Sequence, residues 1–179
     1  VPHFNVPLAY PGKYVMTLHD LLWHNQHDAR ATTLPPWQYA VKRLAYKCVS
    51  EQAIRRAQAV IVPTKVVAQD VTNIIGRSQG VEVLSEGIPE LYKKTPLHFE
   101  KVTERYCVYT GNLYPHKNFV TILRALQLDP SMRLKVVGAR SVFMDDAKKM
   151  AEDLGVEQQI DWLGFTKDED LIALYQCAV

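Results

Sequence analysis

One loop of the sequence brings a glycine, a lysine and the expected start of a helix together. Gly111 directly follows an apolar run, and Lys117 and Asn118 stand at the far end of the loop. Glycine lets the backbone approach a ligand closely, lysine supplies positive charge, and free N–H groups at a helix N-terminus favour an anion. This spacing predicts a phosphate-binding loop. Without a Walker or G-x-G-x-x-G signature the motif is unspecific, and a solvated surface lysine is the alternative.

Two further loops are candidate ligand sites because of their place in the pattern. The first expected strand ends in His19 and Asp20, and a later one ends in Gly138, two positions before Arg140. Ligands bind at the carboxyl ends of the strands in parallel sheets. We therefore expect all three loops to lie at ligand-binding edges.

Metal chemistry is not expected. His24, His27 and Asp28 lie close together in sequence, but their loop has no i, i+4 helical spacing, so no metal site is predicted. The cysteines are Cys48, Cys107 and Cys177. An odd number without C-x-x-C spacing predicts reduced, buried thiols rather than a disulfide framework.

The elements that position these loops alternate between strand and helix. The first series is predicted as strand 13–18, loop 21–36, helix 37–57, strand 59–62, helix 65–75 and strand 81–84. The second is predicted as strand 105–110, helix 118–128, strand 133–137, helix 144–154, strand 159–163 and helix 168–176. Such alternation predicts an α/β fold with parallel sheets.

A break separates the two series. Residues 91–104 have no sustained period, contain Pro96 and several charges, and read as a linker between residues 1–90 and 105–179. The chain has 179 residues, which suits one domain or two small ones.

Composition excludes several classes of protein. Hydrophobic residues make up 47% and charged residues 22%, which is typical of a globular domain, and a net charge of +2 gives no support for a nucleic-acid partner. No apolar run approaches the roughly 20 residues that cross a bilayer. We therefore expect a soluble cytoplasmic protein.

The predicted helix 37–57 has an apolar stripe with two interpretations. Its apolar positions are Trp37, Ala40, Val41, Leu44, Ala45, Cys48 and Val49. The stripe indicates either core packing on a parallel sheet, which we favour, or a membrane-facing surface. The second interpretation would place peripheral contact at the inner face of the membrane.

Several segments together resemble a known family. In chain order they are TLHDL at residues 17–21, AVIVPT at 59–64, SEGIP at 85–89 and YTGNLYPHKN at 109–118. Residues 134–138, and 160–165 with 168–175, match two further β-α units. This pattern resembles the retaining GT-B glycosyltransferases of family four, the group 1 glycosyltransferases. The resemblance implies two Rossmann-like units, each incomplete: the second half of an N-terminal, acceptor-side domain and the first half of a nucleotide-sugar-binding domain.

The resemblance implies a role for each candidate residue. Lys117 would contact the donor diphosphate, together with Gly111, Asn112, Asn118 and Gly138. Many family members have arginine at the position of Asn112, so the second phosphate cation is not assigned, although Arg140 could approach the same crevice.

On the acceptor side, the resemblance implies that His19 contacts the sugar or the acceptor hydroxyl and that Asp20 orients His19 or binds acceptor. A loop histidine without a role is the alternative. Retention is usually assigned in this family to the donor phosphate, so no protein nucleophile is nominated and neither cofactor nor metal is expected.

The implied activity is that of a hexosyltransferase in polysaccharide biosynthesis, which moves a sugar from a nucleotide-sugar donor to a glycan or lipid-linked acceptor. The family's glutamate loop is not in these residues, so we expect no transfer by the chain alone and self-association through exposed sheet edges. The alternative is a non-catalytic α/β module that binds a nucleotide or phosphate. A flavodoxin- or receiver-like domain lacks support, because no acidic cluster or Ser/Thr-rich phosphate loop is found at the strand ends.

Overall fold

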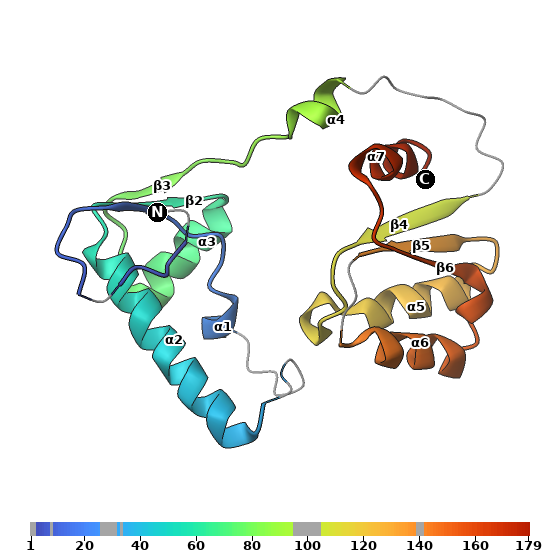
Figure 1. The fold of residues 1–179 in the computed structure, drawn as a ribbon, viewed down its shortest axis with the longest axis horizontal. Helices are drawn as coiled ribbons and strands as arrows, with labels where there is room; N and C mark the ends of the chain where they lie inside the picture. Colours follow the sequence, from blue (N-terminus) through green and yellow to red (C-terminus); the bar gives the residue numbers. More distant parts are fainter. Residues whose placement is uncertain (1–2, 8, 26–31, 33, 95–104, 139–141) are drawn as a thin grey trace. The chain divides into compact units, whose positions relative to one another are not determined.

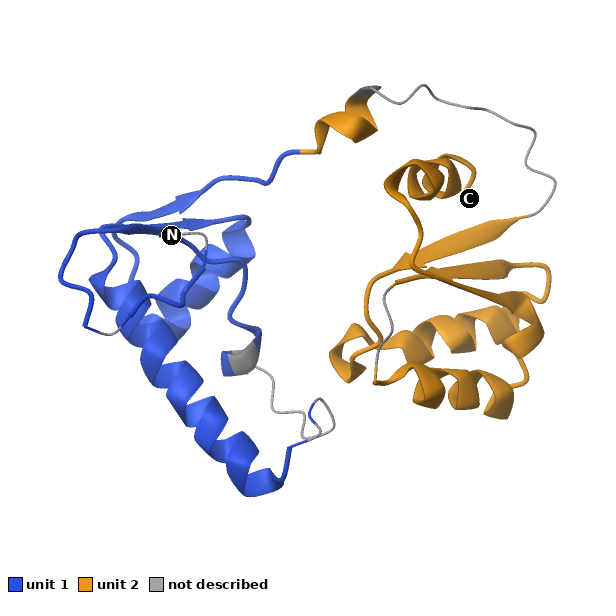
Figure 2. Ribbon diagram, viewed as in Figure 1, with its two compact units in different colours: residues 1–87 blue, residues 88–179 orange. Residues whose placement is uncertain are grey.

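The computed structural model describes residues 3–7, 9–25, 32, 34–94, 105–138 and 142–179. They form two compact units, residues 1–87 and 88–179 (Figure 2). Both units are α/β with parallel sheets, as the sequence predicts. Of the expected linker, residues 95–104 lie outside the described part. Its first four residues belong to the short helix α4 (Glu90–Lys94), where the sequence analysis expected no regular structure.

The first unit contains a sheet of strand order β1-β2-β3 (Figure 1). Its strands are β1 (Val15–Thr17), β2 (Ala59–Val62) and β3 (Val81–Val83). Its helices are α1 (Leu22–Asn25), α2 (Pro36–Arg56) and α3 (Lys65–Asp70), which continues as the π-helix η2 (Val71–Ile75). Helix α1 lies where a loop was predicted: Asp20 Oδ1 accepts the Leu22 N–H at 2.9 Å, and such an N-terminal contact favours a helical turn.

The core of the first unit lies on one face of this sheet. Met16, Val60 and Val62 are fully buried, and Ile54 of α2 and Val71 of η2 are fully buried in the same cluster. Burying each such side chain contributes roughly 1.5–3 kcal/mol. Residues 14–18, 53–62 and 67–75 therefore hold the carboxyl end of β1 in place.

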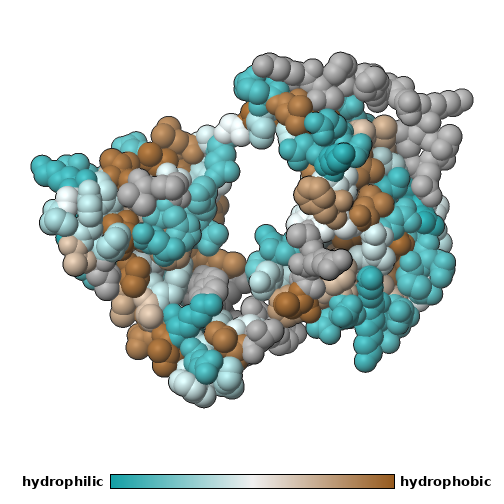
Figure 3. All heavy atoms as spheres, in the orientation of Figure 1, coloured by the Kyte–Doolittle hydropathy of each residue, from teal (hydrophilic) through white to brown (hydrophobic). Residues whose placement is uncertain are grey.

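Helix α2 corrects the core-packing interpretation of its apolar stripe. Only Ser50, Ala53 and Ile54 are buried, while Trp37 is 68% exposed and Leu44 65% exposed. Figure 3 shows hydrophobic side chains at the surface over this part of the unit. The reason is geometric: the described strands are short, so only the last two turns of the 21-residue helix lie against them.

The second unit contains a sheet of strand order β4-β5-β6. Its strands are β4 (Tyr106–Thr110), β5 (Arg133–Val137) and β6 (Ile160–Gly164). Helices α5 (Phe119–Leu128) and α6 (Met144–Asp153) cover one face and α7 (Asp168–Gln176) the other (Figure 1), with 3₁₀ turns η3 (Pro115–Lys117) and η4 (Glu157–Gln159). The core packs Leu123 and Phe119 of α5 against Leu134 and Val136 of β5.

The cysteines are not the buried thiols that the sequence suggests. Cys48 is exposed, because it lies on the uncovered part of α2, and Cys107 and Cys177 are half-buried. All three are free thiols.

The edge strands are β1 and β3 in the first sheet and β4 and β6 in the second, and Val179 N–H donates to Tyr106 O of β4 at 3.1 Å. Within the described part of the chain, no helix combines the length and apolarity needed to span a membrane.

Candidate functional site

Three glycines stand side by side at the carboxyl ends of β4, β5 and β6. Gly111 N–H donates to Val137 O at 3.0 Å, and Gly138 N–H donates to Gly164 O at 2.9 Å. A Cβ on Gly138 would overlap the carbonyl oxygen of Gly111. Gly138 is therefore required for backbone packing, because it lets the Gly111 loop close onto the sheet edge.

Gly111 provides an open stretch of backbone. Its φ is +134°, a conformation that favours glycine, and no atom lies within 4 Å of a Cβ placed on it. A ligand can therefore approach the peptide groups at this strand end without displacing a side chain.

The loop after Gly111 is held by three contacts. Leu113 is 5% exposed and anchors the loop in the core of the second unit. Tyr109 Oη donates to the carbonyl oxygen of Asn112 at 2.6 Å, and Thr110 Oγ1 and Tyr175 Oη are 2.5 Å apart. The contact of Asn112 with Tyr109 is therefore made by its backbone carbonyl and not by its side chain, and these contacts preorganise the loop.

Lys117 and Asn118 lie at the far end of this loop, where the structure corrects the predicted helix start. Lys117 closes the 3₁₀ turn η3, and Asn118 has the left-handed φ of +52°, so that α5 begins at Phe119. Both side chains are exposed. The left-handed residue turns the chain between η3 and α5, and the loop therefore carries a cation one turn before a ten-residue helix.

Arg140, the other predicted donor contact, lies outside the described residues. Phe143, a described aromatic residue close to it in sequence, packs on Tyr114, with the two ring centroids 5.0 Å apart. The Tyr114 ring also stacks on His116. His116 therefore contributes to the packing of the loop.

In the first unit, His19 pairs with a residue that the sequence analysis did not nominate. His19 Nδ1 lies 2.7 Å from Glu86 Oε1. Glu86 follows β3, so both residues stand at the carboxyl edge of the same sheet, on either side of β2. The sequence contained one signal for this pair, because each residue follows a predicted strand and the ends of parallel strands share an edge.

Asp20, which was expected to orient His19 or to bind acceptor, makes a different contact among the described residues. Asp20 Oδ1 instead accepts the Leu22 N–H, and Glu86 is the acid that contacts the imidazole. With His19 neutral and Nδ1–H donating to the Glu86 carboxylate, Nε2 has a lone pair available for a hydroxyl proton. The two side chains are 52% and 65% exposed, so this pair orients the ring and adds little stability.

His24 belongs to a buried polar cluster. Its Nε2 lies 2.9 Å from Ser50 Oγ, and Ser50 donates to the Tyr46 carbonyl oxygen at 2.7 Å, so His24 Nε2–H is the donor to Ser50. Burial lowers the pKa of His24, and nearby Glu51 partly opposes this shift. Among the residues that the structure describes, no group of three or more His, Cys, Asp or Glu side chains is placed to bind a metal ion.

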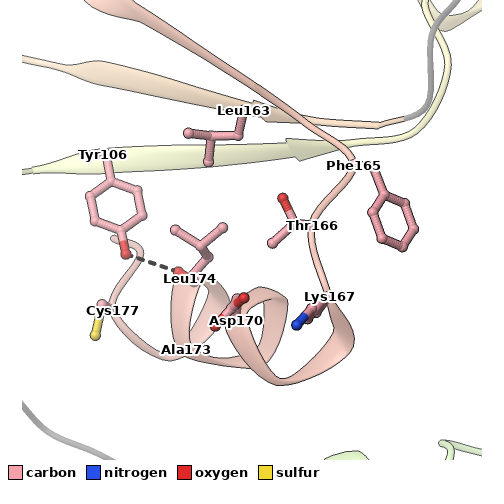
Figure 4. Close-up of a pocket in the computed structure, with 9 residues that line it drawn as sticks. All are labelled: Tyr106, Leu163, Phe165, Thr166, Lys167, Asp170, Ala173, Leu174 and Cys177. Atoms are coloured by element: carbon pink, nitrogen blue, oxygen red, sulfur yellow. Dashed lines mark hydrogen bonds between the residues drawn. The ribbon is translucent and has the colours of Figure 1, made fainter.

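A hollow of about 650 Å³ lies between β6 and α7 (Figure 4). Leu163, Phe165 and Leu174 give it an apolar lining, and Tyr106 Oη donates to the Leu174 carbonyl oxygen at 3.1 Å. The residues of the Gly111 loop do not line it. The candidate anion site and this hollow are therefore separate features of the second unit.

Comparison with known proteins finds a match to a family within the second unit. Residues 93–178 match the family described as "Glycosyl transferases group 1". No curated protein matches the chain.

Solved structures share the fold over most of the chain. They include HepE (Alr3699) of Anabaena in complex with UDP and glucose, at 20% identity and a TM-score of 0.64, covering 92% of this chain and 44% of that one. TarM has 19% identity and a TM-score of 0.64, covering 98% and 32%. The lipopolysaccharide outer core galactosyltransferase WaaB in its apo form has 15% identity and a TM-score of 0.56, covering 76% and 38%.

These likenesses show the class of fold: the two units are Rossmann-like units of the GT-B architecture. The chain spans less than half the length of each of these structures.

Proposed function

We propose that this chain is part of a retaining family-four hexosyltransferase. It would transfer a sugar from a nucleoside-diphosphate donor to a glycan or lipid-linked acceptor in polysaccharide biosynthesis, in the cytoplasm or at the inner face of the membrane. The observation that carries the proposal is the loop of the second unit: open backbone at Gly111, then Lys117, then the start of α5. This loop lies inside the segment that matches the glycosyl transferases group 1.

The loop suits the chemistry of a leaving diphosphate. Breaking the bond between the sugar and the diphosphate leaves negative charge on the phosphate oxygens, and preorganised donors and cations lower the barrier to that step. Lys117 would supply the cation, and the backbone N–H groups at the start of α5 would supply neutral donors. No metal is required for this stabilisation, and none is part of the proposal.

The first unit would act on the acceptor. His19, held by Glu86 through Nδ1, would contact the acceptor hydroxyl or the sugar through Nε2. In a retaining reaction the donor phosphate would take the proton of the attacking hydroxyl as the new glycosidic bond forms on the same face. His19 therefore acts by hydrogen bonding and orientation, and no residue of the chain is assigned as a nucleophile.

The first test is nucleotide binding to the 179-residue chain. HepE and TarM have both been solved with UDP, which makes UDP the probe of choice. We expect UDP to bind in isothermal titration calorimetry, and Lys117→Ala to weaken binding on the order of tenfold, the loss typical of one charged hydrogen bond. Lys149→Ala, an exposed lysine of α6, is the matched control and should bind UDP as the unaltered chain does.

Activity gives the second readout. In the longest open reading frame that contains this sequence, Lys117→Ala should cost about 2–4 kcal/mol of transition-state stabilisation, as removal of one preorganised electrostatic contact does. UDP binding that ignores Lys117, or turnover within about threefold of the unaltered enzyme, contradicts the assignment. Lys117-dependent UDP binding without transfer to any acceptor would instead support the non-catalytic nucleotide-binding module.

A further inference from the structure

The strand end at Gly111 gives a ligand space, but its own N–H is already in use. Gly111 N–H donates to Val137 O at 3.0 Å, and a backbone N–H has a single hydrogen to give. Tyr109 likewise gives its hydroxyl proton to the carbonyl oxygen of Asn112, at 2.6 Å. An anion that approaches Gly111 therefore needs another donor at this point of the loop.

Two hydroxyl groups meet directly before Gly111. Thr110 is the last residue of β4, and its Oγ1 lies 2.5 Å from Oη of Tyr175, which belongs to α7 and stands 65 positions later in the chain. Thr110 is exposed and ends the strand. The hydroxyl pair therefore lies at the carboxyl edge of the sheet, next to the open backbone of Gly111.

Helix α7 is fixed to the strand that carries Thr110. Ile172 of the helix is buried, and Tyr106 Oη of β4 donates to the carbonyl oxygen of Leu174, the residue before Tyr175, at 3.1 Å (Figure 4). The Tyr175 side chain therefore starts from a backbone held against β4. Because the pair is preorganised in this way, a ligand does not have to order it, which favours affinity.

The two hydroxyl groups have two protons, and their mutual hydrogen bond uses one of them. A phenol is more acidic than an alkyl hydroxyl and is the better donor, so Tyr175 Oη–H donates to Thr110 Oγ1. The proton of Thr110 is then left over, because the Thr110 side chain has no further hydrogen-bond partner among the residues that the structure describes. A hydroxyl that already accepts a hydrogen bond is also a stronger donor.

A phosphate oxygen is the acceptor that suits this proton. Hydrogen bonds to anionic oxygens are shorter and stronger than those between neutral groups, and Lys117 brings positive charge to the same loop. Residues 110–118 contain no Asp or Glu, so the loop itself does not repel an anion. Asn112 stands where many members of the family that the sequence resembles have arginine, and a neutral hydroxyl would supply a donor beside it.

We propose that the Thr110 hydroxyl donates a hydrogen bond to a phosphate oxygen of the nucleoside diphosphate, and that Tyr175 is the positioning residue that orients this hydroxyl. The inference rests on the proposed function and adds a neutral donor to the loop of Gly111 and Lys117. The proton stays on Thr110 throughout. As negative charge develops on the leaving diphosphate, the same hydrogen bond strengthens and lowers the barrier.

The test is a titration of the isotope-labelled 179-residue chain with UDP and, separately, with inorganic pyrophosphate, followed in backbone amide spectra. Both ligands contain two linked phosphates, so we expect both to shift the signals of Gly111, Asn112 and Leu113. Thr110→Val keeps the shape of the side chain without its hydroxyl and should weaken both ligands about tenfold, the loss typical of a hydrogen bond to a charged group. Thr110→Ser keeps the hydroxyl and should bind as the unaltered chain does.

Tyr175→Phe tests the positioning role, because it removes only the phenol hydroxyl. Thr110 keeps its proton in this variant, so binding should weaken by only about two- to threefold, the lower end of what a neutral hydrogen bond contributes. Thr110→Val combined with Tyr175→Phe should bind as Thr110→Val alone does, because Tyr175 acts through Thr110. Tyr10→Phe is the matched control, since Tyr10 lies in the first unit and is 43% exposed, as Tyr175 is.

A purely structural role of Thr110 predicts a different order of variants. Valine suits a β-strand better than serine does, so a residue that only supports β4 would make Thr110→Ser the weaker binder. That order overturns the inference. Binding that Thr110→Val leaves unchanged overturns it too, as does a larger loss in Tyr175→Phe than in Thr110→Val, which would make Tyr175 the donor.

These outcomes are distinct from those that test the proposed function. UDP binding that depends on Lys117 but ignores the Thr110 hydroxyl would remove this inference and leave the proposed function in place. Pyrophosphate binding through the Thr110 hydroxyl without any UDP binding would keep the phosphate contact and contradict the nucleotide donor. If neither ligand shifted the loop signals, this inference would be wrong, and the proposed function would depend on the activity of Lys117→Ala in the longer reading frame.

Discussion

The two units place different kinds of groups at the same position of the same fold. Both are three-stranded parallel sheets with candidate sites at the carboxyl edge. In the second unit the strand ends are Gly111, Gly138 and Gly164, and the backbone itself forms the candidate site. In the first unit the edge carries side chains, with His19 and Glu86 paired across β2.

This difference predicts how each candidate site responds to amino-acid substitution. A backbone site depends on close approach between main chains, so adding one carbon can disrupt it together with its surroundings. A side-chain site on an exposed edge can lose a group and leave the fold intact, because the pair of His19 and Glu86 contributes little to stability. The second unit should therefore be less tolerant of small substitutions at its site than the first.

The largest effect is expected for Gly138→Ala. The new Cβ would overlap the carbonyl oxygen of Gly111, and backbone cannot move aside as a flexible side chain can. We expect a loss of about 3 kcal/mol from the second unit, the upper end of overpacking costs, and loss of UDP binding. Hydrogen exchange followed by mass spectrometry measures the two units separately.

Gly87→Ala is the control for this substitution, because no atom lies within 4 Å of a Cβ placed there. Its stability should match that of the unaltered chain. A Gly138→Ala variant as stable as Gly87→Ala would show that the strand ends can separate freely, and would remove the contrast between the two units.

A second, smaller effect is expected at Arg77 in the first unit. Its guanidinium donates to carbonyl oxygens at the carboxyl end of α2: those of Ile54, Ala57 and Gln58. Because these carbonyls have no partners further along the helix, Arg77→Ala should cost about 1.5–3 kcal/mol of the first unit's stability, as loss of charged hydrogen bonds does.

Arg77→Lys sharpens this prediction, since lysine keeps the charge but lacks the fork that reaches several carbonyls. It should recover only part of the loss in urea unfolding, while Arg55→Ala, on the exposed side of the same helix, should change little. If Arg77→Lys were as stable as the unaltered chain, the positive charge at the helix end would account for the whole effect of Arg77.

The smallest effect is the pH dependence that His24 gives to the first unit. Its pKa is lowered in the folded state below its ordinary value of 6.5, chiefly by burial. The unfolded chain therefore binds the proton more readily, so stability should fall as pH drops through 6.5 and level off below the folded pKa. His24→Gln should flatten this slope in unfolding midpoints measured between neutral and mildly acidic pH. A slope that survives the substitution must come from another group.

Local signals in the sequence determined much of the fold. Thr64 caps α3 through the Val67 N–H, and Gly76, at φ +71°, ends η2, as those residue types predict. Short apolar runs bounded by glycine or proline fell in the observed strands because a buried parallel strand needs little more than that pattern. The Gly111 loop could be recognised for the same reason, since its glycine, lysine and helix start are neighbours in sequence.

Only the tertiary structure decided which groups share an edge and which apolar faces are covered. Glu86 stands 67 positions after His19, and register across β2 brings the two within 2.7 Å. The rings of Phe4 and Tyr46 likewise meet although the two residues are far apart in sequence. The stripe of α2 has a periodic sequence whether or not a sheet lies beneath it, so periodicity could not tell that Trp37 and Leu44 are exposed. Sequence patterns indicate local conformational preference. Contact between distant segments depends on strand order, on strand length and on how much of each helix the sheet covers.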